Sequence, residues 1–284
     1  MSATTPLRLR PLEIGDLLDE TFRMYRRHFL LFAGLSMILA IPSAALSGFF
    51  SYALLNGLWQ TTPGQPPNFN VNVLGTTLVA AVVVLLITLV LLPFFYGAVT
   101  FAACESALGR PVTAAGVLNG VLRRYFQLLG YWLLISLMLI AFCLLPLWIW
   151  IWVGWVAVMP ILFIENVGLG AAMGRSRRLV EGRWWRTFLI VFLIFIVIYA
   201  VRIALGAFIA IAEGLLQLVV SPLVVAWVSG ASGVIVDSLV NPVFQIAIVL
   251  IYFDLRVRRE ALDLFQLAQG LPSPPPLPGM ASTS

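Results

Sequence analysis

Residues 188–212 read FLIVFLIFIVIYAVRIALGAFIAIA, an unbroken apolar stretch in which Arg202 is the only charged side chain. About 20 apolar residues in a helix cross the roughly 30 Å hydrocarbon core of a bilayer. Other apolar runs of at least that length occupy residues 29–55, 73–104, 128–164 and 215–253. The five runs together predict an all-α, polytopic membrane protein.

The composition excludes an ordinary soluble domain. Of the 284 residues, 61% are hydrophobic and only 10% are charged. Soluble globular domains average about 45–50% apolar and about 25% charged residues. So few charges would leave most of a soluble protein's surface apolar.

Arginine placement predicts the orientation in the membrane. The 17 basic residues are all arginine, and 16 of them lie outside the apolar runs in four segments: Arg8, Arg10, Arg23, Arg26 and Arg27; Arg110, Arg123 and Arg124; Arg175, Arg177, Arg178, Arg183 and Arg186; Arg256, Arg258 and Arg259. Short arginine-rich segments stay in the cytoplasm. Both termini are therefore expected there, with an even number of crossings between neighbouring segments.

That rule divides the runs into about six transmembrane helices, arranged as three hairpins. Pro146 splits the third run, because proline favours a helix break. The uncharged connection 56–72 is expected outside. The expected spans are 29–55, 74–101, 128–145, 147–164, 188–212 and 232–253.

The remaining segments complete the expected layout. Residues 214–230 contain Ser221-Pro222 at their centre, which predicts an interfacial or re-entrant segment on the outer face. Residues 1–269 form a single integral membrane domain. The proline-rich residues 270–284 are expected to be a disordered tail.

A similar stretch precedes each hairpin, at 14–29, 113–126 and 168–185. Each has apolar positions at helical spacing and ends in a basic and aromatic cluster. This pattern predicts a cytoplasmic amphipathic helix on the inner leaflet, with arginines at anionic headgroups and aromatic rings at the same depth. The candidate lipid contacts are Arg26, Arg27, Arg123, Arg124, Arg183, Trp184, Trp185 and Arg186.

Charged residues inside spans are functional candidates, because burying them in hydrocarbon is costly. Counted from the cytoplasmic ends of their spans, Arg202 and Asp237 lie about 22 and 26 Å deep at 1.5 Å per residue. In antiparallel helices they are expected to form an ion pair, with Glu213 as an alternative partner for Arg202. The pair would either fix helix register or belong to a substrate or proton site.

Four polar residues lie near the cytoplasmic ends of spans: Glu105, Glu165, Asn166 and Asp254. The carboxylates are expected to pair with nearby arginines. A shared polar vestibule is the alternative.

No catalytic or cofactor-binding pattern is evident. The sequence lacks a Gly-rich phosphate loop, HExxH, GxSxG and metal-spaced His/Cys clusters. The single histidine, His28, is expected at the membrane interface. Cys104 and Cys143 are expected to be small buried hydrophobes. The prediction is therefore a protein without catalytic residues, cofactor or metal.

Four segments carry a family resemblance: RPLEIGDLLDETFRMYRRHF (10–29), ALGRPVTAAGVLNGVLRRYFQLLG (107–130), PILFIENVGLGAAMGRSRRLVEGRWWRTF (160–188) and YFDLRVRREALDL (252–264). The chain resembles the glycerophosphoryl diester phosphodiesterase membrane-domain proteins of bacteria over residues 8–268. In some relatives this region precedes a soluble phosphodiesterase domain. The resemblance implies the stand-alone membrane module, without catalytic residues.

These observations lead to one main functional expectation and two alternatives. The main expectation is a non-catalytic protein of the bacterial plasma (inner) membrane. It would bind anionic lipid headgroups and act as a scaffold or regulatory module for a membrane or cytoplasmic protein. The alternatives are a transporter or flippase-like permease with a site near Arg202 and Asp237, and an intramembrane enzyme. No nucleic acid partner is expected, and the oligomeric state is left open.

Overall fold

The computed structural model describes residues 13–38, 41, 59–60, 68–69, 71–140 and 145–260. Within them, the short strands β1 (Trp59–Gln60) and β2 (Asn68–Phe69) pair antiparallel, and the remaining regular structure is helical. The helices are α1 (Ile14–Arg27), a short apolar helix at Phe29–Ile38, α3 (Val71–Ala107), α4 (Ala114–Ile140), α5 (Leu145–Gly154), α6 (Val158–Ile164), α7 (Leu169–Val180), α8 (Trp184–Leu216) and α9 (Pro222–Glu260).

Four described helical stretches are long and apolar enough to cross a membrane: Ala81–Ala107, Pro146–Ile164, Trp184–Leu216 and Trp227–Glu260. The all-helical membrane fold agrees with the sequence prediction. Most of the expected span 29–55 lies outside the described residues, as does the tail at 270–284. The described helices therefore support a membrane protein without establishing six spans.

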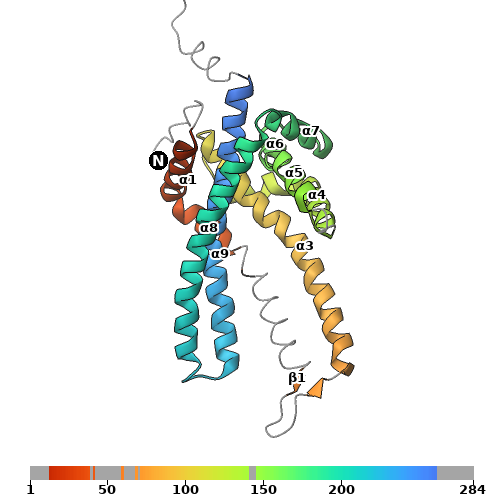
Figure 1. Ribbon diagram of the computed structural model, residues 1–284, viewed down its shortest axis with the longest axis vertical. Helices are drawn as coiled ribbons and strands as arrows, with labels where there is room; N and C mark the ends of the chain where they lie inside the picture. Colours follow the sequence, from red (N-terminus) through yellow and green to blue (C-terminus); the bar gives the residue numbers. More distant parts are fainter. Residues whose placement is uncertain are drawn as a thin grey trace, which may run out of the picture.

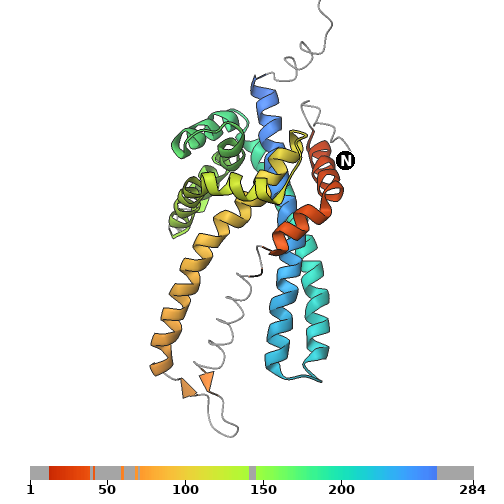
Figure 2. The ribbon, with the colours of Figure 1, turned by 180° about the vertical axis from the view of Figure 1, so that it is seen from behind.

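The long helices form two diverging legs that join at one end of the molecule (Figures 1 and 2). Helices α8 and α9 run side by side as one leg, and α3 forms the other. Helices α1 and α4 to α7 gather where the legs join, and β1 lies at the opposite end of the molecule. The shorter helices therefore surround one end of the long ones.

The hydrophobic core lies at this joined end. It contains the second half of α3 (98–107), the second half of α9 (243–257) and the inner faces of α1, α4, α6 and α7. In the span windows, 67% of α9 is buried but only 17% of α8. Helix α9 is thus central, whereas the outer half of α8 presents apolar side chains that only acyl chains or another protein would cover.

The structure corrects the expectation for residues 214–230. Helix α8 continues to Leu216 and α9 begins at Pro222, so only a short turn separates them. Proline is well tolerated in the first turn of a helix, where its missing N–H has no intrahelical partner to lose. Pro222 therefore begins a helix, and no separate re-entrant segment forms there.

The expected second hairpin also differs. Residues 114–140 form the continuous helix α4, which joins the expected surface helix to the start of the expected span 128–145. The expected span 147–164 is divided into α5 and α6 by a turn at 155–157. Both views show α4 crossing the region where the legs join (Figures 1 and 2).

The amphipathic helices α1 and α7 cover protein with their apolar faces. In α1, Leu17 and Met24 are buried in the core, and Tyr25 Oη donates a 2.7 Å hydrogen bond to the Leu239 carbonyl of α9. In α7, Ser176 Oγ donates to the Gly154 carbonyl at 2.8 Å. These contacts replace the membrane contact that the sequence predicted for these faces, and leave the polar faces outward.

Candidate functional site

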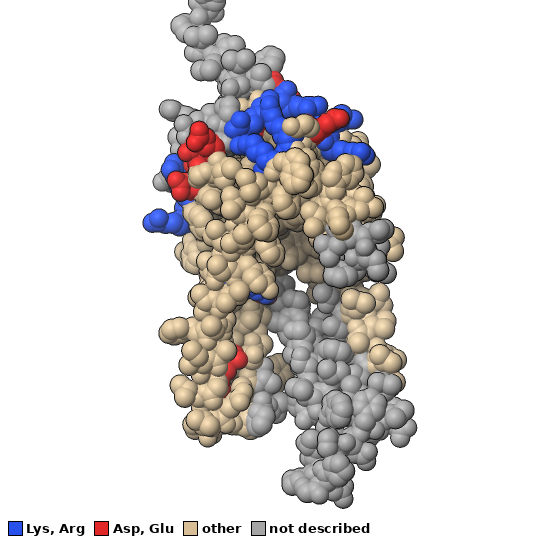
Figure 3. Space-filling view, viewed as in Figure 1, with Lys and Arg blue, Asp and Glu red and all other residues tan. Residues whose placement is uncertain are grey.

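The described arginines other than Arg202 gather at the joined end of the molecule (Figure 3). We call this surface the arginine face, and define it by the described arginines of α1, α7 and α9, the α3–α4 region and the start of α8. Its members are Arg23, Arg26, Arg27, Arg110, Arg123, Arg124, Arg175, Arg177, Arg178, Arg183, Arg186, Arg256, Arg258 and Arg259. Some face carboxylates and others do not.

The largest carboxylate network joins α7 to the end of α9. Arg175 Nε lies 3.1 Å from Glu165 Oε2, and its Nη2 pairs with Glu260. Tyr252 Oη donates to Glu165 at 3.0 Å, and Arg256 donates to both Tyr252 and Glu260. Burial lowers the pKa of Arg175, but its bonds to Glu260 and Glu165 outweigh this and raise that pKa above its ordinary value. This network fixes α7 against α9.

A second network surrounds Asp254, whose side chain is only 1% exposed. Its Oδ2 lies 2.6 Å from Arg186 Nη1 of α8, and its Oδ1 accepts a 2.9 Å hydrogen bond from Arg258 Nε. Burying a carboxylate is costly unless charged and hydrogen-bonding partners surround it. Arg186, expected as a lipid contact, is therefore engaged in joining α8 to α9.

Three further carboxylates of this end of the molecule each face a single arginine. Glu105 lies 3.3 Å from Arg110, Glu181 lies 3.7 Å from Arg259, and Glu20 pairs with Arg23. Glu105, Glu165 and Asp254 thus face arginines but have separate partners. They do not share one hydrogen-bonded cluster of the kind that a common vestibule would need.

Seven arginines of the face have no carboxylate partner among the described residues: Arg26, Arg27, Arg123, Arg124, Arg177, Arg178 and Arg183. Arg177 lies over the Trp150 ring, 5.1 Å from its centroid. His28 lies next to Arg27. Two effects lower the pKa of His28 below its ordinary value: burial, which is the larger, and the positive charge of Arg27. These arginines leave positive charge available to an external anion.

Exposed aromatic rings stand beside these arginines. Phe126 follows Arg123 and Arg124 and is 83% exposed; Trp185 follows Arg183 and is 77% exposed. Trp184 differs, because its Nε1 donates to the Trp150 carbonyl at 3.1 Å and its ring stacks on Phe188. Of these two tryptophans, Trp185 is therefore the exposed one.

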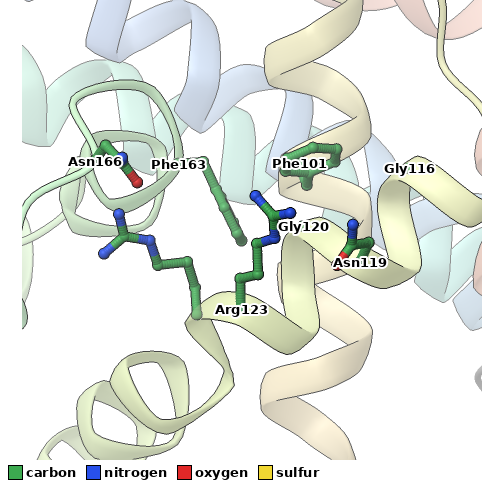
Figure 4. Close-up of a pocket in the computed structure, with 8 residues that line it drawn as sticks. Phe101, Gly116, Asn119, Gly120, Arg123, Phe163 and Asn166 are labelled. Atoms are coloured by element: carbon green, nitrogen blue, oxygen red, sulfur yellow. The ribbon is translucent and has the colours of Figure 1, made fainter.

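A cavity of about 290 Å³ lies between α3, α4 and the turn after α6 (Figure 4). Arg123 and Asn119 rise from α4 toward Phe101 and Phe163, and Asn166 faces them from the turn. The other lining residues are Gly116, Gly120 and Arg124. Asn166, which the sequence placed in a candidate cytoplasmic polar cluster, has a left-handed backbone with φ of 58° and lines this cavity.

A larger cavity of about 580 Å³ lies between α5, α7 and the start of α8. Trp150, Trp155 and Trp184 line it together with Arg177 and Arg178. Its carboxylate, Glu181, also approaches Arg259. This second cavity is therefore lined mainly by aromatic and basic side chains.

The structure brings Arg202 and Asp237 together in the outer half of α8 and α9. Arg202 Nη2 lies 2.6 Å from Asp237 Oδ1, and the two side chains are 46% and 37% exposed. Glu213, the alternative partner, instead accepts a 2.9 Å hydrogen bond from Ser232. Neither cavity described above is lined by these residues, so neither supports a permease site there.

Sequence reasoning did not identify Asn119 or the Arg177–Trp150 contact. Asn119 precedes Arg123 by four residues, a spacing that places both side chains on one helix face. This spacing could have indicated from the sequence that the two residues line the same site. Trp150 and Arg177 lie on different helices, and no local pattern joins them.

Comparisons with protein-family models, with curated protein sequences and with solved structures found no match. The family resemblance of the four sequence segments thus stays a prediction.

Proposed function

We propose that this chain is a non-catalytic module of the bacterial plasma membrane that binds anionic lipid headgroups through its arginine face. It crosses the membrane six times with both termini in the cytoplasm, and its lipid-bound face scaffolds or regulates a membrane or cytoplasmic protein. The proposal rests on one observation: seven arginines without a carboxylate partner in the described structure lie at one end of a bundle of apolar helices.

The surroundings of these arginines support the proposal. A juxtamembrane arginine contributes about 1 kcal/mol to binding an anionic leaflet. Exposed aromatic rings favour the headgroup region, where one edge meets water and the rest meets lipid. Phe126 and Trp185 have this exposure beside unpaired arginines. By contrast, Arg175, Arg186 and Arg259 pair with carboxylates from other chain segments and so join helices at this end of the molecule.

Lipid preference is the first test. The variant R26Q/R27Q/R178Q removes three exposed arginines without carboxylate partners. We expect its preference for phosphatidylglycerol over phosphatidylcholine to fall at least about tenfold, since three arginines at about 1 kcal/mol each exceed the 1.4 kcal/mol of a tenfold change. The measurement is mass spectrometry of the lipids bound to the purified protein from mixed nanodiscs.

The matched control is R23Q/R110Q/R259Q, which removes the same charge from exposed arginines that face carboxylates. We expect it to retain most of the preference, because those guanidinium groups are already engaged. Equal behaviour of the two variants would show that net charge, and not this set of unpaired arginines, determines lipid preference.

A further inference from the structure

The 290 Å³ cavity presents polar groups from one face of α4. Asn119 and Arg123 are four residues apart, so their side chains lie one above the other on the helix. Gly116 and Gly120 lie on the same face and also line the cavity. Asn166 closes the opposite side from the turn after α6 (Figure 4). Donors from two chain segments thus surround one space.

The wall of the cavity is packed and leaves little freedom for adjustment. Phe101 and Phe163 meet edge to face, with centroids 5.4 Å apart. A Cβ at Gly120 would lie 2.4 Å from Phe101 Cε2. The phenyl ring therefore uses the space that glycine leaves, and the cavity has a fixed apolar wall beneath its polar rim.

Among the described residues, no carboxylate lines the cavity beside its positive charge. The described lining residues include Arg123 and Arg124 but no Asp or Glu. Arg124 Nη1 donates to Gln127 Oε1 at 2.9 Å and to the Val167 carbonyl at 3.2 Å, which fixes its guanidinium group. Arg123 makes no ion pair within the described residues. One fixed and one free guanidinium group favour a ligand with several anionic oxygens.

We infer that this cavity binds a phosphate group. A guanidinium group is positively charged and can donate two hydrogen bonds to two oxygens of one phosphate. The amides of Asn119 and Asn166 supply neutral donors. A carboxylate ligand has two oxygens, whereas a phosphate offers enough to meet donors from both α4 and the opposite turn. If the proposed function holds, the phosphate belongs to a lipid headgroup, and in this the inference rests on that function. Free phosphate presents the same oxygens to the site.

The cavity is large enough for the phosphate of a lipid headgroup but too small for the acyl chains. A volume of about 290 Å³ is just below the about 300 Å³ at which sites for drug-sized molecules begin. It accommodates a phosphate and not two acyl chains. Exposed Phe126, two residues beyond Arg124, offers apolar surface for chains that remain outside.

The test uses the full chain in detergent with two probes, dioctanoyl phosphatidic acid and inorganic phosphate, followed by native mass spectrometry and calorimetry. Asn119→Asp places a carboxylate in the cavity at nearly unchanged size, and Arg123→Gln removes the free guanidinium group. We expect saturable binding of one phosphatidic acid, weakened at least tenfold by either change. Arg23→Gln, at an exposed arginine that already faces Glu20 and lies outside this cavity, is the control and should bind as the wild type does.

The probes distinguish the source of the phosphate. Tighter binding of phosphatidic acid than of inorganic phosphate assigns a lipid headgroup, whereas equal binding assigns free phosphate, and both support the site. Failure of both probes to bind saturably, or wild-type binding by both cavity variants, would overturn the inference. Neither Asn119 nor Arg123 is altered in the lipid-preference variant, so this site and the wider arginine face fail or succeed independently.

Discussion

The carboxylate of Asp254 is almost fully buried, and each of its oxygens meets a different arginine, from α8 and from α9. Asp254→Asn removes the charge but keeps the size. We expect it to lower the free energy of unfolding by about 1–3 kcal/mol, because one of the two partly buried arginines then faces an amide NH₂ group in place of an acceptor oxygen. Thermal unfolding of the purified protein in detergent measures the change.

Glu105→Gln is the matched control for this residue. It also neutralises one carboxylate that faces an arginine, but Arg110 is 62% exposed and solvent screens the pair. Exposed pairs contribute about 0–1 kcal/mol. If Glu105→Gln lowered the free energy of unfolding as much as Asp254→Asn does, burial of the carboxylate would not explain the effect of Asp254→Asn.

Single residues differ in how far the sequence determines their partners. Counting along two antiparallel apolar runs was sufficient to place Arg202 opposite Asp237. The same method fails for Arg186 and Asp254, because both lie near several charged side chains and sequence spacing does not choose among them. Asn119 was missed because an isolated asparagine carries no charge signal, and its cavity exists only once α3 and α6 pack on α4.

At the scale of elements, Gly120 sets how closely α3 approaches α4. In Gly120→Ala the new Cβ would lie 2.4 Å from Phe101 Cε2, well inside van der Waals contact. We expect the free energy of unfolding to fall by about 1–3 kcal/mol, the usual effect of overpacking. The melting temperature in detergent should fall with it.

Gly170→Ala provides the comparison, since Gly170 lies in α7 and a Cβ there meets nothing within 4 Å. Alanine favours helix over glycine by about 0.8–1.0 kcal/mol, so this variant should be neutral or slightly stabilised. A similar loss in both variants would contradict the steric role of Gly120.

Element boundaries show why part of the fold was predictable. The long apolar runs gave α3, α8 and α9, because length and apolarity are properties of the segment itself. Pro222 was read as a break within a segment, although the same residue suits the first turn of a helix. The amphipathic stretches at 14–29 and 168–185 predicted helices, but periodicity does not state whether protein or lipid covers the apolar face.

At the scale of the whole molecule, the orientation is testable by single-cysteine labelling in a Cys104→Ser, Cys143→Ser background. The probes are cysteines at Thr62, Ala115, Ala171, Ser221 and Ser273. We expect labelling from outside only at Thr62 and Ser221, because arginine-rich segments remain in the cytoplasm. Ala115 is preferred to Gly109 as the α3–α4 probe, since Gly109 has φ of 72° and cysteine there would be strained.

Labelling of Ser273 from outside would require an odd number of crossings and would contradict the proposed orientation. The sequence predicted the common placement of the arginines well, because the positive-inside rule acts on each segment independently. It could not predict how the shorter helices cluster around the ends of α3 and α9, since that depends on contacts between distant segments.

The pairing of Arg202 with Asp237 also bears on how the chain enters the membrane during synthesis. An arginine at the centre of a lone helix disfavours insertion through the translocon by about 2.5–3.5 kcal/mol. Its partner belongs to the next helix and emerges from the ribosome only later. We therefore expect α8 to stay within the insertion machinery until α9 arrives, so that the two enter the bilayer as one hairpin.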